Sequence, residues 1–312
     1  LWVLVGNAVA LTLVGIVHRF TSNGKVFWML EIPGAIGFSS FIYHNHGAAY
    51  VALFAMAAVG LAAWVRLESL RRMARSSPAM VWGVMALIML VGVAYSTSRA
   101  GAGLLVGFLG LAALVSLFVR PSSAGPSTTP RAVGVSLAVI VVGCMAFIIA
   151  KSDLTGLTSK FERLFEQGSK EESYGLRIMA RERAFEMLED NWVRGTGTGS
   201  FRFLFPTYAK RTPELYREGR VYWEHAHIDW LQFPIEQGIA GCAIIAAALG
   251  WCLFRWWKTG GWRHPLPLIL FLACVQTMVH ALIDFPFQNA AIFIAWWTLL
   301  IIALRWLEFE EA

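Results

Sequence analysis

Long apolar runs constrain this chain more than any other feature of its sequence. A helix needs about 20 mostly apolar residues to cross a hydrocarbon core about 30 Å thick, and the bilayer forces backbone groups to be satisfied within such helices. The sequence therefore predicts an all-α integral membrane protein, a polytopic helical bundle of about eight spans. The expected spans are 1–17, 46–65, 79–96, 101–119, 132–150, 239–257, 266–283 and 289–306.

The composition supports this class and argues against others. Of the 312 residues, 57% are hydrophobic and only 15% charged, whereas soluble domains are about 45–50% apolar. A net charge of +6 would suggest nucleic acid for a soluble protein, but much of the basic excess lies in short loops, where it sets membrane orientation. No nucleic-acid partner is expected. The four cysteines lie in apolar runs without metal-ligand spacing, so neither a disulfide framework nor a zinc site is indicated.

The basic residues of the short loops predict the orientation of the chain. Ten lie on one side of the expected spans and three on the other, so the positive-inside rule makes the first side cytoplasmic. The expected organisation is 1–150 with about five spans, a large outer loop over 151–238, and 239–312 with about three spans and a short cytoplasmic tail. Because the chain begins at Leu1 within an apolar run, further helices are expected upstream.

The segment 151–237 is too long to be a simple connection, which is typical of a functional insert. Two stretches in it have helical spacing, "FERLFEQ" and "YGLRIMARERAFEMLED". The second carries Ile178, Phe185 and Leu188 on one predicted side, with Arg177 and Arg181 paired at i, i+4. "RGTGTGS" then ends the helix.

The unusual polar residues gather at one expected membrane face. Six of the seven histidines are predicted at the outer leaflet, which indicates a functional site there because scattered structural histidines would have no reason to choose a side. The residues concerned are His18, His44, Asn45, His46, Ser96, Thr97, Ser98, Arg99, His225, His227, Asp229, Glu236, His280 and Asp284.

The arginines have competing interpretations. Arg99 follows three small polar residues with no nearby charge to pair it, so it is either an interfacial anchor or the partner of an external anion. Arg177 and Arg181 form either an anion site or a solvated helix face paired with Glu182 and Glu186.

Two short motifs also allow more than one interpretation. "GTGTGS" resembles a phosphate-binding loop only faintly, since it lacks the usual glycine spacing and follows no predicted strand, and a flexible turn is favoured. "HAHID" has a pattern used by metal hydrolases, but no second histidine lies beside Asp229. A single histidine acting as general base and oriented by an acid needs less machinery.

Several motifs together resemble a known family. "AHIDWLQFPIEQGIAG" is similar to the H-N-D-Y-L-Q-x-x-x-E-x-G-x-x-G signature of the O-antigen ligase and O-antigen polymerase superfamily of bacterial membrane glycosyltransferases. "FIYHNHGAAYVAL", "STSRAGAGLL", "GLRIMARERAFEMLEDNWVRGTGTGSF" and "HALIDFPFQNAA" resemble its other conserved stretches, in the same order. The sequence departs from the family pattern at Ile228, at Ala180 and in lacking the usual proline before Gly195.

The resemblance implies a glycosyltransferase that moves a glycan from a polyprenyl-diphosphate carrier to an acceptor hydroxyl. It implies a multi-pass protein of the bacterial inner membrane with its active site at the periplasmic face, acting in lipopolysaccharide or other surface-polysaccharide synthesis. Its partners would be the lipid-linked donor, a saccharide or protein-hydroxyl acceptor and the bilayer, and no cofactor or metal is expected. The candidate catalytic residues are His227, Asp229 and Glu236, and the candidate diphosphate and glycan ligands are Arg99, Arg177, Arg181, Asn45, His46, Gly197 and Gly199.

Two other classes remain open from the sequence. A polysaccharide or ion transporter would place polar groups near the bilayer midplane, whereas the centres of the expected spans are nearly free of charge. A non-catalytic envelope assembly protein would use the long loop to bind partners.

Overall fold

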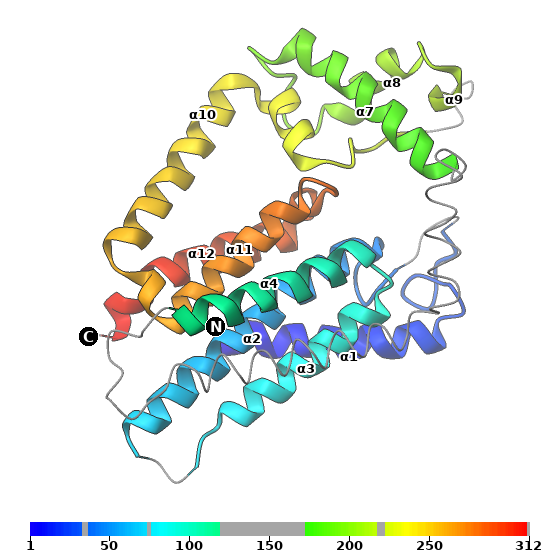
Figure 1. Ribbon diagram of the computed structural model, residues 1–312. Coiled ribbons are helices and arrows are strands. Elements are labelled where there is room, and N and C mark those ends of the chain that lie inside the picture. The colour runs from blue at the N-terminus through cyan, green and yellow to red at the C-terminus, as the bar shows by residue number, and fades with distance from the viewer. Residues whose placement is uncertain (33–36, 74–75, 119–171, 217–221, 311–312) are drawn as a thin grey trace. The chain divides into compact units, whose positions relative to one another are not determined.

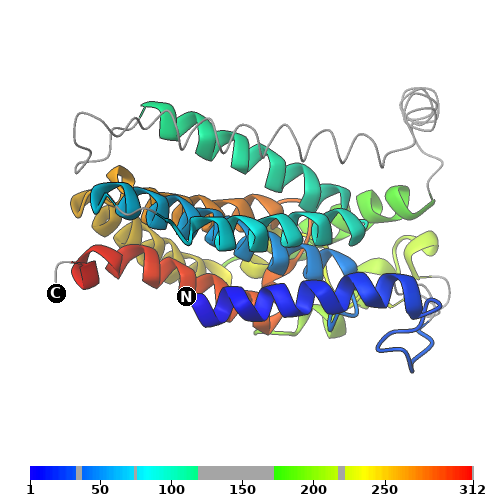
Figure 2. The same cartoon turned by 90° about the horizontal axis from the view of Figure 1, so that it is seen from below.

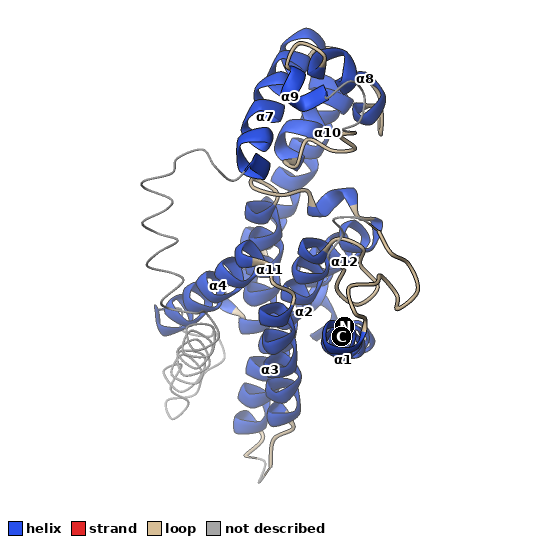
Figure 3. Ribbon diagram, turned by 90° about the vertical axis from the view of Figure 1, so that its right-hand side faces the viewer, coloured by secondary structure: helices blue, strands red, loops and turns tan. Residues whose placement is uncertain are grey.

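The computed structural model describes residues 1–32, 37–73, 76–118, 172–216 and 222–310. Every regular element within these ranges is a helix, connected by loops and turns (Figures 1 and 3). Internal contacts divide the chain into two units. Unit 1 comprises Leu1–Ile148, Leu253–His280 and Asn289–Ala312, and unit 2 comprises Ile149–Cys252 and Ala281–Gln288.

Unit 1 is a bundle built around one buried helix. Helix α2 contacts each of the other long helices of the unit. Its residues from Gly47 to Leu61 are small or apolar and are buried on every side of the helix, as expected for a helix that is apolar all round. Figure 2 shows that the axes of the long helices are roughly aligned with one another, from α1 in blue to α12 in red. They are α1 (Trp2–Thr21), α2 (His44–Arg71), α3 (Ala79–Tyr95), α4 (Arg99–Phe118), α11 (Pro265–His280) and α12 (Ala290–Glu310).

Small residues bring the helices of unit 1 into close contact. A methyl group added to Gly60 of α2 would lie 2.9 Å from a side-chain carbon of Leu266 in α11. One added to Gly101 of α4 would lie 2.9 Å from Cβ of Ala48 in α2. Such residues let backbones approach in membrane bundles. The second contact also places the beginnings of α2 and α4 side by side.

The helices are those of a membrane protein. By length and composition, four could cross a bilayer: Trp2–Thr21, His44–Arg71, Asp229–Lys258 and Ala290–Glu308. Ala79–Tyr95, Arg99–Val115 and Pro265–His280 are apolar but shorter. Seven of the eight expected spans thus correspond to helices, while the one over 132–150 lies outside the described residues. The total of eight spans, the outer position of the large loop and the division at 150 and 238 stay predictions.

Two helices extend further than the apolar runs indicated. Helix α2 continues to Arg71 instead of ending near 65, because Glu68 forms ion pairs with Arg71 and Arg72 at 3.4 and 2.6 Å that support a solvated last turn. Helix α10 (Asp229–Lys258) begins ten residues before the expected span at 239 and crosses a kink at Gly238.

Unit 2 packs three helices of the large loop against the first part of α10. They are α7 (Glu172–Asn191), α8 (Phe201–Ala209) and α9 (Pro213–Tyr216). The turn 281–288, with its short helix η3 (Pro286–Gln288), also belongs to this unit. The second expected helix of the loop is thus confirmed as α7, whereas the "FERLFEQ" stretch lies outside the described residues.

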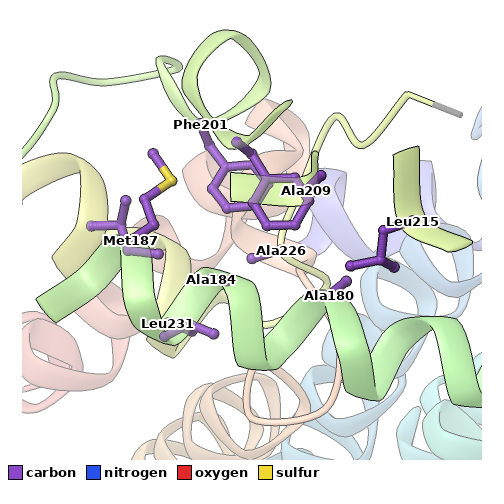
Figure 4. Close-up of a cluster of buried hydrophobic side chains, with 10 residues drawn as sticks. Ala180, Ala184, Met187, Phe201, Ala209, Leu215, Ala226 and Leu231 are labelled. Carbon is purple, nitrogen blue, oxygen red and sulfur yellow. The ribbon is translucent and has the colours of Figure 1, made fainter. Parts of the chain in front are cut away.

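The buried face of α7 is formed largely by small residues. Ala180, Ala184 and Met187 belong to the core with Phe201 and other residues of α8 (Figure 4). Of the apolar residues expected on one side of this helix, Ile178 and Phe185 are 41% and 55% exposed, whereas Leu188 packs against the core. Small alanines allow the phenylalanine rings of α8 to pack close to the α7 backbone, which the size of Ile178 and Phe185 would prevent.

Candidate functional site

The glycine loop after α7 is fixed against the kink of α10. Gly195 and Gly238 both have positive φ angles, of 69° and 62°. A methyl group on Gly238 would lie 2.6 Å from the amide nitrogen of Gly195, and one on Gly195 would lie 2.5 Å from the carbonyl oxygen of Glu236. Only glycine satisfies both the backbone angle and the contact. The kink therefore exists because two backbones meet there without side chains.

Hydrogen bonds from the loop complete this contact. The amides of Thr196 and Gly197 donate to the carbonyl oxygens of Ile235 and Glu236 at 3.0 and 2.8 Å. These carbonyls would otherwise be left without helical partners at the kink. The loop thus satisfies the backbone that the kink exposes.

The Glu236 carboxylate caps helix α8. Its Oε2 accepts the amide N–H of Gly199 at 3.0 Å, and its Oε1 accepts that of Phe201 at 3.3 Å. Glu236 is 5% exposed. The first amides of a helix are an anion site, and here an internal carboxylate occupies it. The Gly199 amide is thereby committed to the Glu236 carboxylate, and the Gly197 amide to the Glu236 backbone carbonyl, so neither is directed at open solvent.

Gln232 connects the same carboxylate to the histidine segment. Its Nε2 donates to Oε1 of Glu236 at 3.0 Å, one helical turn away, and its Oε1 accepts the amide N–H of Ala226 at 3.0 Å. Ala226 lies between the two histidines of the motif.

The two histidines lie in an irregular segment before α10 and are not related by helical geometry. The ring of His225 is stacked on Phe285 with the ring centroids 4.9 Å apart. Its Nδ1 lies 3.3 Å from Nε2 of Gln232. Burial lowers the pKa of His225, while the charge of Glu224 opposes this shift.

His227 is held in an aromatic setting with a left-handed backbone. Its φ angle is 55°, which costs a non-glycine residue about 1–2 kcal/mol. Its ring meets Phe285 edge to face at 4.6 Å and Trp223 at 5.8 Å between centroids. A strained backbone persists only where its surroundings hold it in place, which is common at functional sites.

Asp229 ties the beginning of α10 to the turn 281–288. Its buried carboxylate accepts the amide of Phe287 at 2.8 Å and Nε2 of Gln288 at 3.0 Å. Its own amide donates to the carbonyls of Ala281 and Asp284 at 3.1 and 3.2 Å. Asp229 thus fixes the turn that carries Phe285, the ring against which both histidines pack.

The arginines of α7 do not form the ion pairs considered from the sequence. Glu186 pairs instead with Arg183 at 2.6 Å and with Arg211 at 3.1 Å. Within the described part of the chain, no ion pair involves Arg177 or Arg181, and Nε of Arg181 is buried without a hydrogen-bond partner. The geometry therefore disfavours the solvated, self-paired face for these two residues.

The remaining candidate residues belong to unit 1. Arg99 is exposed at the first position of α4, and the hydroxyl of Ser98 accepts the amide of Gly101 at 3.1 Å to cap that helix. The N-terminus of a helix carries partial positive charge. The guanidinium of Arg99 adds to this charge, so the position favours the binding of an anion. Asn45 donates to the Tyr43 hydroxyl at 2.8 Å, and the ring of His46 packs against the same tyrosine. Since α2 and α4 begin side by side, Arg99, Asn45 and His46 lie at the same end of unit 1.

Among the described residues, no group of three or more His, Cys, Asp or Glu side chains could hold a metal ion. Metal-independent chemistry stays a prediction.

Sequence reasoning missed three residues that shape the site. Gln232 stands in the quoted motif, four residues before Glu236, and this i, i+4 spacing was the available signal. Trp223 and Phe285 gave no comparable signal, because an apolar ring near the expected membrane face resembles ordinary packing, although both segments were expected at that face.

The fold and site together define a polytopic helical membrane protein whose histidine motif is anchored to a large loop. The chain belongs to the O-antigen ligase family, whose model matches residues 84–246, just over half of its length. No curated protein matches the chain. Membership makes this protein a membrane enzyme of ligase or polymerase type in glycan assembly. The matched range contains Arg99, Arg177 and His227 but ends before the turn 281–288.

Proposed function

We propose that this protein transfers a glycan from a polyprenyl-diphosphate carrier to an acceptor hydroxyl at the periplasmic face of the bacterial inner membrane. The observation that carries the proposal is the state of the arginines in the matched range. In the described part of the chain, Arg99, Arg177 and Arg181 take part in no ion pair, although Glu186 on α7 pairs with two other arginines. Permanent cations left without a carboxylate suit an anionic ligand.

The diphosphate would be bound by these arginines. A guanidinium offers a planar fork of donors that matches phosphate oxygens and stays charged at any physiological pH. Negative charge grows on the diphosphate as the glycosidic bond breaks, so the same contacts strengthen in the transition state. The carrier bond is already activated, and the transfer would need no ATP or other cofactor.

His227 is the stronger candidate for the base that removes the acceptor proton. Gln232 presents an N–H donor to Nδ1 of His225, so His225 serves there as an acceptor in its neutral form. The His227 ring packs edge to face against both Trp223 and Phe285, and its strained backbone holds it in place. A histidine titrates near neutral pH and suits general-base catalysis at the water boundary.

The contacts of the two acids favour positioning over direct proton transfer. The Glu236 carboxylate accepts two backbone amides and one side-chain amide, and that of Asp229 accepts two donors from the turn 281–288. Gly197 and Gly199 would then contribute by shaping the loop, and Asn45 and His46 by contacting the glycan near Arg99.

Donor binding by arginine variants tests the proposal with a control on the same helix. Purified protein in liposomes is supplied with a polyprenyl-diphosphate-linked glycan, and donor affinity and transfer are measured. Arg177→Ala should weaken donor binding about 10- to 100-fold, the loss expected for one or two charge-assisted hydrogen bonds. Arg177→Lys should recover little, because an ammonium lacks the fork.

Arg183→Ala is the matched control, since Arg183 lies on α7 but is paired with Glu186. It should bind and transfer almost normally. Equal losses in both variants would contradict the proposed role of Arg177. If the unaltered protein transfers no glycan but moves the lipid-linked glycan across the bilayer, the proposed function is wrong and the protein is a transporter. The acceptor that becomes glycosylated distinguishes a ligase from a polymerase or a protein glycosyltransferase.

A further inference from the structure

Gln232 is one of the most buried polar residues of unit 2, at 1% exposure. Its side-chain amide has three neighbours, two in the histidine segment before α10 and one on α10 itself. They are the backbone amide of Ala226 before His227, the Glu236 carboxylate that caps α8, and the His225 ring. A buried amide costs free energy unless it is hydrogen-bonded, so this position is specific for a side chain with both donor and acceptor.

The orientation of the Gln232 amide follows from its partners. A backbone N–H can only donate, so the atom facing Ala226 must be the oxygen Oε1. The nitrogen Nε2 then faces Oε1 of Glu236, which can only accept when ionised. The same nitrogen faces Nδ1 of His225, which must therefore carry no proton. The three contacts are mutually consistent in one orientation only.

The left-handed conformation of His227 needs support from both sides. On the N-terminal side, Ala226 is held by Gln232. On the C-terminal side, the amide of Asp229 donates to the turn 281–288. Because Glu236 also receives the amides of Gly199 and Phe201, Gln232 connects the His227 backbone to the rigid contact between α8 and the kinked α10.

We propose that Gln232 is a positioning residue for His227, which links the backbone just before the base to the Glu236 cap of α8. This inference rests on the proposed role of His227 as the base. Gln232 need not contact substrate. It holds His227 where the ring can reach the acceptor hydroxyl, and misplacement of a catalytic group by about 1 Å can cost about 100-fold in rate.

The test replaces the amide without changing the length of the side chain. Gln232→Met removes all three hydrogen bonds, whereas the control Gln237→Met removes a different contact between α10 and the glycine loop, an exposed hydrogen bond to Thr198 at 2.7 Å. Gln232→Met should lower single-turnover transfer about 10- to 100-fold and leave donor affinity unchanged within about 2-fold, because the diphosphate ligands lie on other elements. Gln237→Met should transfer at close to the wild-type rate.

Hydrogen exchange provides a second readout that does not depend on activity. Peptides covering 222–228 should exchange faster in Gln232→Met and at the wild-type rate in Gln237→Met, since only the first variant frees the Ala226 amide. Wild-type transfer or unchanged exchange in Gln232→Met would overturn the inference. An equal fall in donor affinity and transfer would also overturn it, because general disruption would then explain the loss. If the unaltered protein transfers no lipid-linked glycan, the proposed function fails, while hydrogen exchange still decides whether Gln232 holds the histidine segment.

Discussion

The contact between Gly195 and Gly238 makes a quantitative prediction about how the site is assembled. Gly238 combines a φ angle of 62° with a ψ angle of −171°, a region that is nearly exclusive to glycine and costs other residues about 1–3 kcal/mol. A methyl group there would also push against the Gly195 amide. The loop would have to move, which weakens the hydrogen bonds from Thr196 and Gly197 by about 0.5–1.5 kcal/mol each. Gly238→Ala should therefore destabilise the loop by about 2–6 kcal/mol.

Two other glycines separate the causes of this loss. Gly197 has a φ angle of 94°, but a methyl group added there would meet only open space, so Gly197→Ala should show only backbone strain of about 1–2 kcal/mol. Gly250 lies later in α10 with nothing within 4 Å and ordinary helical geometry, so Gly250→Ala should be neutral or stabilise the helix by up to about 1 kcal/mol.

Hydrogen exchange at the Thr196 and Gly197 amides measures the local free energies, and thermal midpoints in detergent give the ranking of the three variants. The expected order of damage is Gly238→Ala, then Gly197→Ala, then Gly250→Ala. A Gly238→Ala protein no less stable than Gly197→Ala would refute the claim that two backbones meet at the kink.

Three further predictions concern the histidine segment and its chemistry. Burial lowers the pKa of His225 below its ordinary 6.5, so in the range between the folded and unfolded pKa the unfolded chain binds more protons, and stability falls as pH drops below about 6.5. The thermal midpoint of His225→Phe should therefore fall less between pH 7 and pH 5 than that of the wild type, and an identical fall would contradict this. Asp229→Asn replaces one of two acceptor oxygens by a donor, so exchange in 281–288 should rise and transfer should fall about 10-fold, whereas normal exchange would argue against the tie to the turn. Transfer by purified protein should survive a strong chelator, and its loss with rescue by one divalent ion would establish a metal requirement.

The sequence predicted most helices because one physical length, the thickness of the bilayer, dictates their apolar runs. It predicted the beginning of α10 poorly, since polar and apolar residues alternate irregularly between Asp229 and Gly238 and hydropathy carries no sign of a kinked helix there. The sequence placed Ile178, Phe185 and Leu188 on one side of α7 but did not indicate which face is buried. The size of a side chain gives no sure guide, since the small Ala180 and Ala184 are buried and the large Phe185 is exposed.

The chemistry of the candidate site was easier to predict than its geometry. His227, Arg99 and Arg177 were candidates because they lie in motifs that resemble those of the O-antigen ligase family, at the membrane face where the polar residues are expected to gather. The sequence did not reveal that Glu236 caps α8, since that contact joins residues 35 or more positions apart. Gln232 and Phe285 were missed because a neutral amide and an apolar ring resemble ordinary packing until their neighbours are known.

The role of His227 as the base is tested most directly by measuring single-turnover transfer and donor affinity of the His227→Ala protein. Purified protein in liposomes receives the polyprenyl-diphosphate-linked glycan and an acceptor, and product is followed with donor binding at equilibrium. A base acts on the acceptor proton and not on the diphosphate, so transfer should fall about 10²- to 10⁴-fold while donor affinity stays near that of the unaltered protein. A His227→Ala protein that still transfers glycan at near the wild-type rate would contradict the account.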